Sequence, residues 1–444
     1  MANKISLENN FPVIEKSNQL FNRALGLIPS VTQTLAKGPG QWVNGIAPKY
    51  LAKGKGCHVW DVDGNEYIDY MMAVGPLSLG YSYPRVDEAI KKQLEDGITF
   101  SMMHPLEVEV AELMRDIIPN AEAVRYSKTG ADATSAAVRL ARAYTGRNKI
   151  LCCGYHGWHD WYIAVTARNY GIPEAVQAIT YTFNYNDIDS VKNSIDDDTA
   201  AIILEPVVFQ EPKDNFLHKL AELCEEKGIV LIFDEMWTGF RMALGGAQQF
   251  FGITPDLATY SKAVANGMPI SILTGKRKIM DLAENDIFFY TTFGGEALSL
   301  AAVKATVAEM RDKDVIKHLS VQGKKLKDGY NEIAQKLGID FTRMSGYNWR
   351  SVAQFDEKAG DPLVQKSLMQ QEMIKRGVLW QGFFNMSFSH ADSDIDYTLQ
   401  ALEQSLAVLK KAVDENRLKE QLLGIPVQPV FRKVDNFNMK PVRK

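Results

Sequence analysis

The segment Leu231-Ile-Phe-Asp-Glu-Met-Trp-Thr-Gly-Phe240 decides how the rest of the chain is interpreted. The apolar run 229–233 is short enough to form one buried strand of a parallel sheet. The run ends in Asp234 and Glu235, and ligands of open α/β sheets bind at the carboxyl ends of the strands. We therefore expect Asp234 to lie where chemistry takes place.

A second segment, Tyr260-Ser-Lys-Ala263, follows another short apolar run, 257–260, which we predict as a strand. A carboxylate and an amine at the ends of neighbouring strands suit the cofactor pyridoxal 5′-phosphate (PLP). Lys262 would form a Schiff base with its aldehyde, and Asp234 would hold a proton on its pyridine nitrogen. Each residue alone has an ordinary explanation, because an acid after a strand is often a helix N-cap and a lone lysine is usually solvated.

The composition is that of a soluble globular protein with more than one domain. The chain has 444 residues, which is too long for one simple core. Acids and bases nearly balance at a formal net charge of −4, so nothing indicates a nucleic-acid partner. The N-terminus lacks an apolar signal core, and no run of about 18 apolar residues indicates a membrane span. The four cysteines lack metal-ligand spacing, and we expect free thiols in a reducing cytoplasm.

The order of the predicted elements indicates an α/β fold. Strands and helices alternate after residue 123, which predicts a mostly parallel sheet with helices on both faces. The predicted strands of this sheet are 123–126, 149–153, 200–204, 229–233 and 270–274, and the predicted helices are 132–144 and 216–227. Elsewhere we predict helices over 8–30, 84–94, 105–118, 298–333, 363–375 and from 393, strands over 351–355 and 378–380, and a hairpin with a type I′ turn at Asp63-Gly64.

These elements predict three domains. Residues 1–70 form an N-terminal helix and hairpin segment that packs on the small domain. Residues 71–330 form the large cofactor-binding domain. Residues 331–444 form a smaller α+β C-terminal domain with a tail.

The segment Lys128-Thr-Gly-Ala-Asp-Ala133 joins a predicted strand to a predicted helix. A helix start offers unpaired backbone N–H groups and a positive dipole end, which together bind phosphate. Gly130 lets the backbone approach closely, and Thr129 adds a hydroxyl. Alone, a Thr-Gly pair of this kind is usually only a turn.

The segment Tyr155-His-Gly-Trp158 directly follows a predicted strand, and an aromatic ring there can stack on a flat cofactor. A packed aromatic cluster is the other interpretation. A metal site of His156, His159 and Asp160 is disfavoured, because it has only two histidines and no clear third ligand.

Two further segments carry polar side chains at predicted turns. Glu205 ends a strand, where it is either an acid beside the cofactor or an exposed loop residue. Thr291 and Thr292 precede a predicted helix and offer hydroxyls to a phosphate.

The ordered set of these motifs resembles the class III aminotransferases, most closely the glutamate-1-semialdehyde aminomutase branch. The likeness extends over roughly residues 25–410 and is specific as a set. The motifs that carry it are Thr129-Gly130, Tyr155-His156-Gly157, Glu205-Pro206, Asp234-Glu235, Thr238-Gly-Phe-Arg241, Lys262, Gly267-Met-Pro269 and Thr292-Phe-Gly-Gly295.

The resemblance implies a fold type I, PLP-dependent enzyme that is a homodimer with shared active sites. Lys262 would be the Schiff-base lysine and Asp234 the partner of the pyridine nitrogen. Tyr155 would stack on one face of the ring and Met236 would pack on the other. The remaining cofactor-binding residues would be Thr129, Gly130 and Ala131 at the phosphate, His156 and Glu205 near the ring, and Thr292 at the phosphate of the neighbouring subunit.

Departures from the family pattern bear on the substrate. The aminomutase carries an arginine in its N-terminal loop that grips a carboxylate, whereas this chain has Thr32-Gln-Thr-Leu-Ala-Lys37. Lys37 cannot reproduce a bidentate fork. A glutamate expected in the late loop is replaced within Gly382-Phe-Phe-Asn-Met386. We therefore expect an amino donor and a carbonyl acceptor other than glutamate semialdehyde, with a polar biosynthetic intermediate as one of them.

Three alternatives remain at this point. The same lysine and aspartate would serve an aminomutase, an epimerase or a decarboxylase, because the orientation of the substrate over the ring decides which bond breaks. A nucleotide-dependent oxidoreductase should show a glycine-rich fingerprint after an early strand, and the sequence contains none. A non-catalytic binding protein on this fold is disfavoured by the presence of both Lys262 and Asp234.

Overall fold

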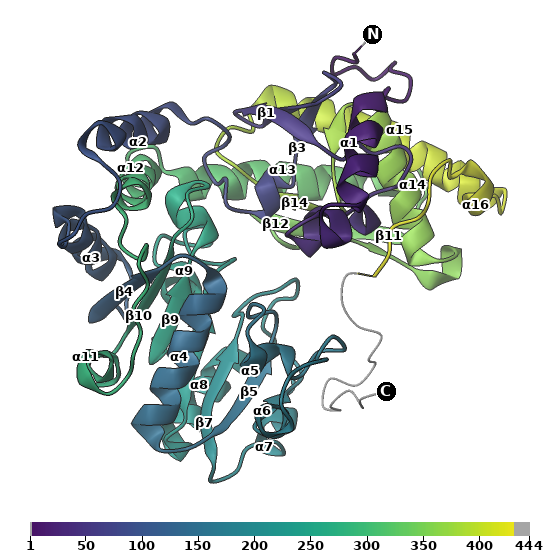
Figure 1. Ribbon diagram of the computed structural model, residues 1–444. Helices are drawn as coiled ribbons and strands as arrows, with labels where there is room; N and C mark the ends of the chain where they lie inside the picture. The colour runs from purple at the N-terminus through teal and green to yellow at the C-terminus, as the bar shows by residue number, and fades with distance from the viewer. Residues whose placement is uncertain (1, 430–444) are drawn as a thin grey trace. The chain divides into compact units, whose positions relative to one another are not determined.

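The structure of the protein is a computed structural model, and it describes residues 2–429 (Figure 1). The described chain divides into two compact units. The central unit contains residues 84–316, and the flanking unit contains residues 2–83 and 317–429. The predicted domain ranges 1–70, 71–330 and 331–444 stay a prediction.

The central unit is built on a sheet of seven strands, in the order β4-β10-β9-β8-β7-β5-β6. The strand β10 runs antiparallel to both of its neighbours, and the other pairs are parallel. The predicted mostly parallel sheet is therefore confirmed. The bounds are β4 Ala123–Ser127, β5 Lys149–Cys153, β6 Thr180–Thr182, β7 Thr199–Leu204, β8 Val230–Asp234, β9 Leu257–Tyr260 and β10 Ser271–Gly275.

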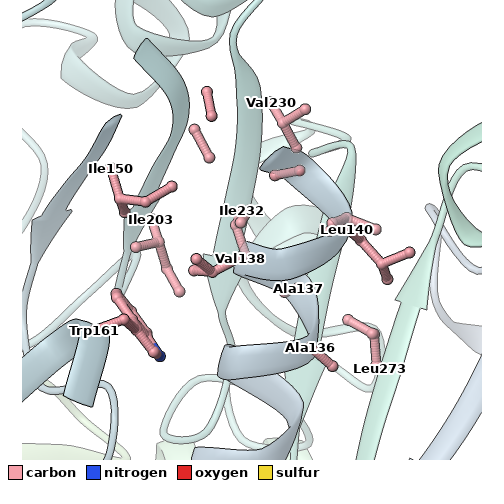
Figure 2. Close-up of a cluster of buried hydrophobic side chains, with 14 of the residues drawn as sticks. Ala136, Ala137, Val138, Leu140, Ile150, Trp161, Ile203, Val230, Ile232 and Leu273 are labelled. Carbon is pink, nitrogen blue, oxygen red and sulfur yellow. The ribbon is translucent and has the colours of Figure 1, made fainter. Parts of the chain in front are cut away.

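The helix α4, Gly130–Thr145, packs across the middle of this sheet (Figure 2). Its small residues Ala136 and Ala137 let the helix approach the strands closely, with Val138 and Leu140 filling the spaces beside them. The strands present branched side chains such as Ile203 and Ile232 to the helix. Burial of such side chains contributes roughly 1.5–3 kcal/mol each, so this core fixes where α4 begins relative to the strand ends.

The remaining helices of the central unit surround the sheet and its connections. Their bounds are α2 Pro84–Asp96, α3 Pro105–Ile117, α5 Asp160–Ile163, α6 Glu174–Ala178, α7 Ile188–Lys192, α8 Phe216–Lys227, α9 Gly246–Phe251, η5 Lys262–Ala265, α10 Arg277–Met280, α11 Leu282–Asn285 and α12 Ala297–Asp312.

The flanking unit contains two smaller sheets. The first has the order β1-β2-β3-β13, and the second has the order β11-β12-β14. The strands are β1 Leu51–Lys55, β2 His58–Asp61, β3 Glu66–Asp69, β11 Thr342–Tyr347, β12 Arg350–Phe355, β13 Val378–Leu379 and β14 Phe383–Asn385. Its helices are α1 Glu15–Leu25, η1 Pro29–Val31, η2 Leu35–Lys37, η3 Pro39–Gln41, η4 Met72–Val74, η6 Glu357–Ala359, α14 Pro362–Lys375, α15 Asp392–Asp414 and α16 Leu418–Gln421, and α13 Val315–Lys336 carries the chain into it.

Three local predictions are wrong. The first helix covers only 15–25, and Leu25 and Leu27 point into solvent instead of forming an apolar face. The hairpin between β2 and β3 exists, but only Gly64 has a positive φ, whereas a type I′ turn requires positive φ at Asp63 too. The long helix of 298–333 is two helices, because the chain breaks at Asp314, which has a φ of +48°. Among the described residues, no helix is both long and apolar enough to cross a membrane.

Candidate active site

Asp234 and Lys262 lie at the carboxyl ends of adjacent parallel strands. Asp234 is the last residue of β8 and is paired in register with Thr259 of β9. Lys262 follows β9 and opens the short helix η5. Its φ of +44° is unusual for a residue with a side chain. Such strain persists only where the surroundings impose it, and it often marks a functional position.

Asp234 is fully buried and is held at both carboxylate oxygens. His156 Nδ1 lies 2.8 Å from Asp234 Oδ2, and the backbone N–H of Met236 donates to Oδ1 at 3.1 Å. The other nitrogen of His156, Nε2, lies 3.1 Å from the carbonyl oxygen of Cys153. The imidazole is therefore held from both sides, between the Asp234 carboxylate and the Cys153 carbonyl. Each carboxylate oxygen can accept more than one hydrogen bond, so Asp234 can still receive a further donor.

The predicted phosphate segment forms the start of α4. Thr129 is its N-cap residue, and its hydroxyl accepts from Asp132 N at 3.2 Å. The first N–H groups of a helix have no partner within it, and here they belong to Gly130 and Ala131. A Cβ at Gly130 would lie 3.1 Å from Sδ and Cε of Met236, so glycine lets the Met236 side chain pack closely on this helix start.

The segment containing Tyr155 and His156 crosses the same helix start. A Cβ at Gly157 would lie 2.6 Å from the Cβ of Ala131, so the two backbones touch at this point. Tyr155 is half exposed, and its ring meets Tyr162 edge-on with centroids 5.6 Å apart. Burial, and then the charges of Asp234 and Glu205, raise the pKa of the Tyr155 phenol, which therefore stays neutral at pH 7.

Glu205 is buried at the end of β7 and is not an exposed loop residue. Its Oε2 accepts from the backbone N–H of Tyr155 at 3.2 Å. A Cβ at Gly154 would lie 2.7 Å from the same oxygen. Glu205 therefore anchors the backbone of the segment that carries the aromatic ring.

Among the contacts of the described residues, none joins Thr292 to the other predicted site residues. It is exposed, and it lies in the turn before α12. Like the other predicted site residues, Thr292 belongs to the central unit.

Two residues near the site, Trp237 and Glu235, were given no role from the sequence. The Lys262 Nζ lies 3.5 Å from the centroid of the Trp237 ring, which is a cation–π distance. Glu235 accepts from the backbone N–H groups of Ala247 and Gln248 at 2.8 and 2.9 Å and from the Thr238 hydroxyl, and it thereby holds the loop after β8. The signal for Trp237 was its place three residues after Asp234, but a tryptophan in a buried run is usually core.

Comparisons with known proteins place this site in a family. The model of the class III aminotransferases matches residues 43–377. The chain belongs to the class III aminotransferases. The 3-aminobutyryl-CoA aminotransferase of Cloacimonas acidaminovorans (strain Evry) is 34% identical over 424 residues, which cover 93% of this chain and all of that protein. A glutamate-1-semialdehyde 2,1-aminomutase 2 of Brevibacillus brevis is 36% identical over 426 residues, or 88% of this chain and 98% of that protein.

A solved structure agrees with the fold. The PLP internal aldimine form of the FumI protein of Sphingopyxis sp. MTA144 is 29% identical and superposes with a TM-score of 0.83, covering 90% of this chain and 97% of that one. The class III aminotransferase therefore has the fold type I architecture and is a PLP-dependent enzyme that acts on an amino donor and a carbonyl substrate.

The residues present fit this cofactor. PLP needs an amine, a carboxylate and an anion-binding backbone, and the central unit brings Lys262, Asp234 and the start of α4 to the same end of the sheet. The absence of a Cβ at Gly130 lets the Met236 side chain pack against this helix start.

Proposed function

We propose that this class III aminotransferase uses Lys262 and Asp234 as its two reacting groups, on a polar amino donor and a carbonyl acceptor. The observation that supports these roles most directly is that Asp234 and Lys262 lie at the ends of neighbouring strands. Asp234 is buried, and both of its carboxylate oxygens have hydrogen-bond partners. When bound, PLP supplies an electron sink for the bond that breaks next to the substrate nitrogen.

Each protein group has one task in this proposal. Asp234 keeps a proton on the pyridine nitrogen, and His156 holds Asp234 in place for it. The Lys262 amine, as general base and then acid, moves one proton between the substrate carbon and the cofactor carbon. Thr129, Gly130 and Ala131 bind the phosphate. Tyr155 stacks on one face of the ring and Met236 packs on the other. Glu205 positions Tyr155 through its backbone N–H.

The substrate proposal rests on the missing carboxylate grip. Lys37 stands in η2 where a bidentate arginine would be expected, and a single ammonium gives no fork geometry. The relative named 3-aminobutyryl-CoA aminotransferase supports a polar substrate other than glutamate semialdehyde. An aminomutase, epimerase or decarboxylase on the same site is the alternative, which the aminomutase name of another relative supports.

A single-turnover experiment separates these reactions. Purified holoenzyme is mixed with candidate amines, including 3-aminobutyryl-CoA and glutamate semialdehyde, and pyridoxamine phosphate is measured by chromatography after denaturation. Transamination leaves pyridoxamine phosphate in an amount equal to the sites, whereas net epimerisation or decarboxylation leaves PLP. High activity on glutamate semialdehyde would overturn the substrate proposal.

The roles of the reacting groups are tested in the same assay. Lys262→Ala should abolish the turnover and the absorbance band of the imine between PLP and the protein. Lys278→Ala is the matched control, because that lysine is exposed beyond β10. Full turnover in Lys262→Ala would remove the catalytic assignment.

The assembly and the compartment are part of the same proposal. A homodimer with shared sites is supported by Thr292, which is exposed among the large exposed side chains Phe288, Tyr290 and Phe293. A cytoplasmic location is supported by the four cysteines, which are all free thiols.

A further inference from the structure

A cluster of metal-ligating side chains lies in the flanking unit, apart from the residues assigned to PLP. Cys57 and His58 stand at the start of β2, and Asp394 is in the first turn of α15. One ligand atom from each of the three residues can be chosen so that all lie within 4.8 Å of one another.

Two of the three pairs of side chains approach each other at distances close to those between the ligand atoms of a zinc site, each through one oxygen of Asp394. His58 Nε2 lies 3.1 Å from Asp394 Oδ1, and Cys57 Sγ lies 3.3 Å from Asp394 Oδ2. Zinc binds sulfur at about 2.3 Å and nitrogen or oxygen at about 2.0–2.2 Å, so tetrahedral ligand atoms stand roughly 3.5 Å apart. Small side-chain movements are enough to admit an ion at the centre of the cluster.

The surroundings of His58 support a metal ligand. Its other ring nitrogen, Nδ1, lies 3.1 Å from Glu66 Oε1 on the neighbouring strand β3. A carboxylate that accepts from Nδ1–H fixes the ring and leaves Nε2 directed at the metal, as metal-bound histidines usually require. The Asp394 side chain is also held, because its Oδ2 accepts from the backbone N–H of Ala391 at 2.9 Å.

We propose that Cys57, His58 and Asp394 bind one Zn²⁺ ion, with Glu66 as the carboxylate that orients His58 and solvent as the fourth ligand. A thiolate, an imidazole and a carboxylate in a tetrahedral set select zinc over magnesium or calcium, which prefer oxygen ligands. His58 is about one-third exposed, which gives solvent and the ion a path to the cluster. Binding displaces the thiol proton of Cys57 and ties the β2–β3 hairpin to α15.

The experiment uses the full-length holoenzyme, freed of adventitious metal with a chelator and then desalted. Isothermal titration with ZnCl₂ should give one saturable site per chain, and metal analysis after gel filtration should return one zinc per chain. Thermal unfolding should shift upward with zinc, because a ligand that binds only the folded state stabilises it. Magnesium chloride should give neither effect.

Variants locate the site. Cys57→Ser and His58→Gln should each abolish saturable zinc binding, and Glu66→Gln should weaken it by about 10–100-fold. Cys224→Ser is the matched thiol control, because Cys224 is buried in α8 of the central unit and should not affect zinc binding. PLP absorbance reports that each variant is folded.

Two outcomes would overturn the proposal. The first is no stoichiometric zinc binding by the wild-type holoenzyme, which would leave a cluster of hydrogen-bonded charges only. The second is zinc binding of wild-type strength in both Cys57→Ser and His58→Gln, which would place the ion elsewhere. His58 and Glu66 are partly exposed, so their variants keep the test usable even if Cys57→Ser fails to fold.

Discussion

At the scale of single residues, Asp234 depends on His156. A carboxylate buried to this degree needs donors on both oxygens, because an unpaired buried charge is costly. His156 supplies one of them from the segment after β5, while the other comes from the backbone two residues along. The imidazole therefore determines how the carboxylate is aimed.

The variant His156→Phe tests this dependence. Phenylalanine keeps a ring of similar size but removes the partner of Asp234 Oδ2, which costs roughly 1–3 kcal/mol. We expect kcat/KM to fall by about 10–100-fold, together with weaker PLP binding. The control is His159→Phe, a histidine of the same segment that bonds Ser135 instead. Equal losses in the two variants would mean that His156 matters only for packing.

Glu235 gives the central unit a dependence on pH. Burial raises the pKa of its carboxyl to about 7, despite three hydrogen-bond donors that lower it. The folded state therefore holds a proton that the unfolded state releases near pH 4.5. The stability from this group is full below pH 4.5 and is lost as the pH rises through about 7.

We therefore expect the free energy of unfolding to fall by about 3 kcal/mol from this group between pH 4.5 and pH 8. Denaturant unfolding at several pH values measures the slope. In Glu235→Gln the side chain is neutral throughout, so this part of the slope should vanish. A slope that persists unchanged in the variant would assign the effect to other groups.

At the scale of elements, glycines decide how closely the site segments meet. The segment that carries Tyr155 and His156 rests on the start of α4 only because position 157 lacks a Cβ. The small residues of α4 pack against the branched side chains of the sheet, and this packing sets where the helix start lies (Figure 2). In the proposed site, phosphate binding and ring stacking are thus coupled through the contact between Gly157 and Ala131.

The variant Gly157→Ala tests the contact. Its new Cβ would meet Ala131 at 2.6 Å, and its φ of +105° would be strained as well. We expect PLP affinity to fall by about tenfold or more, because the helix start and the aromatic segment must separate. Gly171→Ala is the matched control, with a φ of +89° and open space around it. It shares the strain without the collision, so its PLP affinity should stay at the wild-type value in equilibrium titrations.

The sequence predicted the central sheet well and the flanking elements less well. The strand β5 and the helix α8 have the predicted bounds. The strand is a short run of buried residues, and the helix buries one apolar face, so both patterns are visible in the sequence. The helix α1 is shorter than predicted. Leu25 and Leu27 continue the helical spacing of apolar residues in the sequence, but in the structure both side chains are exposed. Tertiary contacts of this kind are not encoded in local spacing.

Within the candidate site, the strand ends and glycine turns were visible in the sequence, but the contacts between side chains were not. Nothing in the order of residues indicated that His156 holds Asp234, since 78 positions separate them. The contact between Lys262 and Trp237 was equally hidden, because it depends on how the loop after β8 folds back. Motifs thus gave the proposed reacting groups, while the contacts of Asp234 and Lys262 with their neighbours required the structure.

At the scale of the whole molecule, the proposed role of Thr292 links catalysis to assembly. The segment 288–293 exposes Phe288, Tyr290 and Phe293, each with more than half of its surface in solvent. Exposed apolar side chains in such a row are typical of a protein interface. If a second copy covers this segment, Thr292 of one chain serves the PLP phosphate of the other, and each site needs both chains.

Mixing two inactive variants tests this arrangement. Lys262→Ala removes the reacting amine, and Thr292→Asp places a negative charge where a phosphate would bind. Each variant alone should be nearly inactive. In a mixed dimer, the site with Lys262 receives its threonine from the Lys262→Ala chain and is intact. Random exchange makes half of the dimers mixed, so about a quarter of the wild-type activity should return. If Thr292 instead served its own chain, no intact site would form in any dimer, and activity would stay at the level of the separate variants.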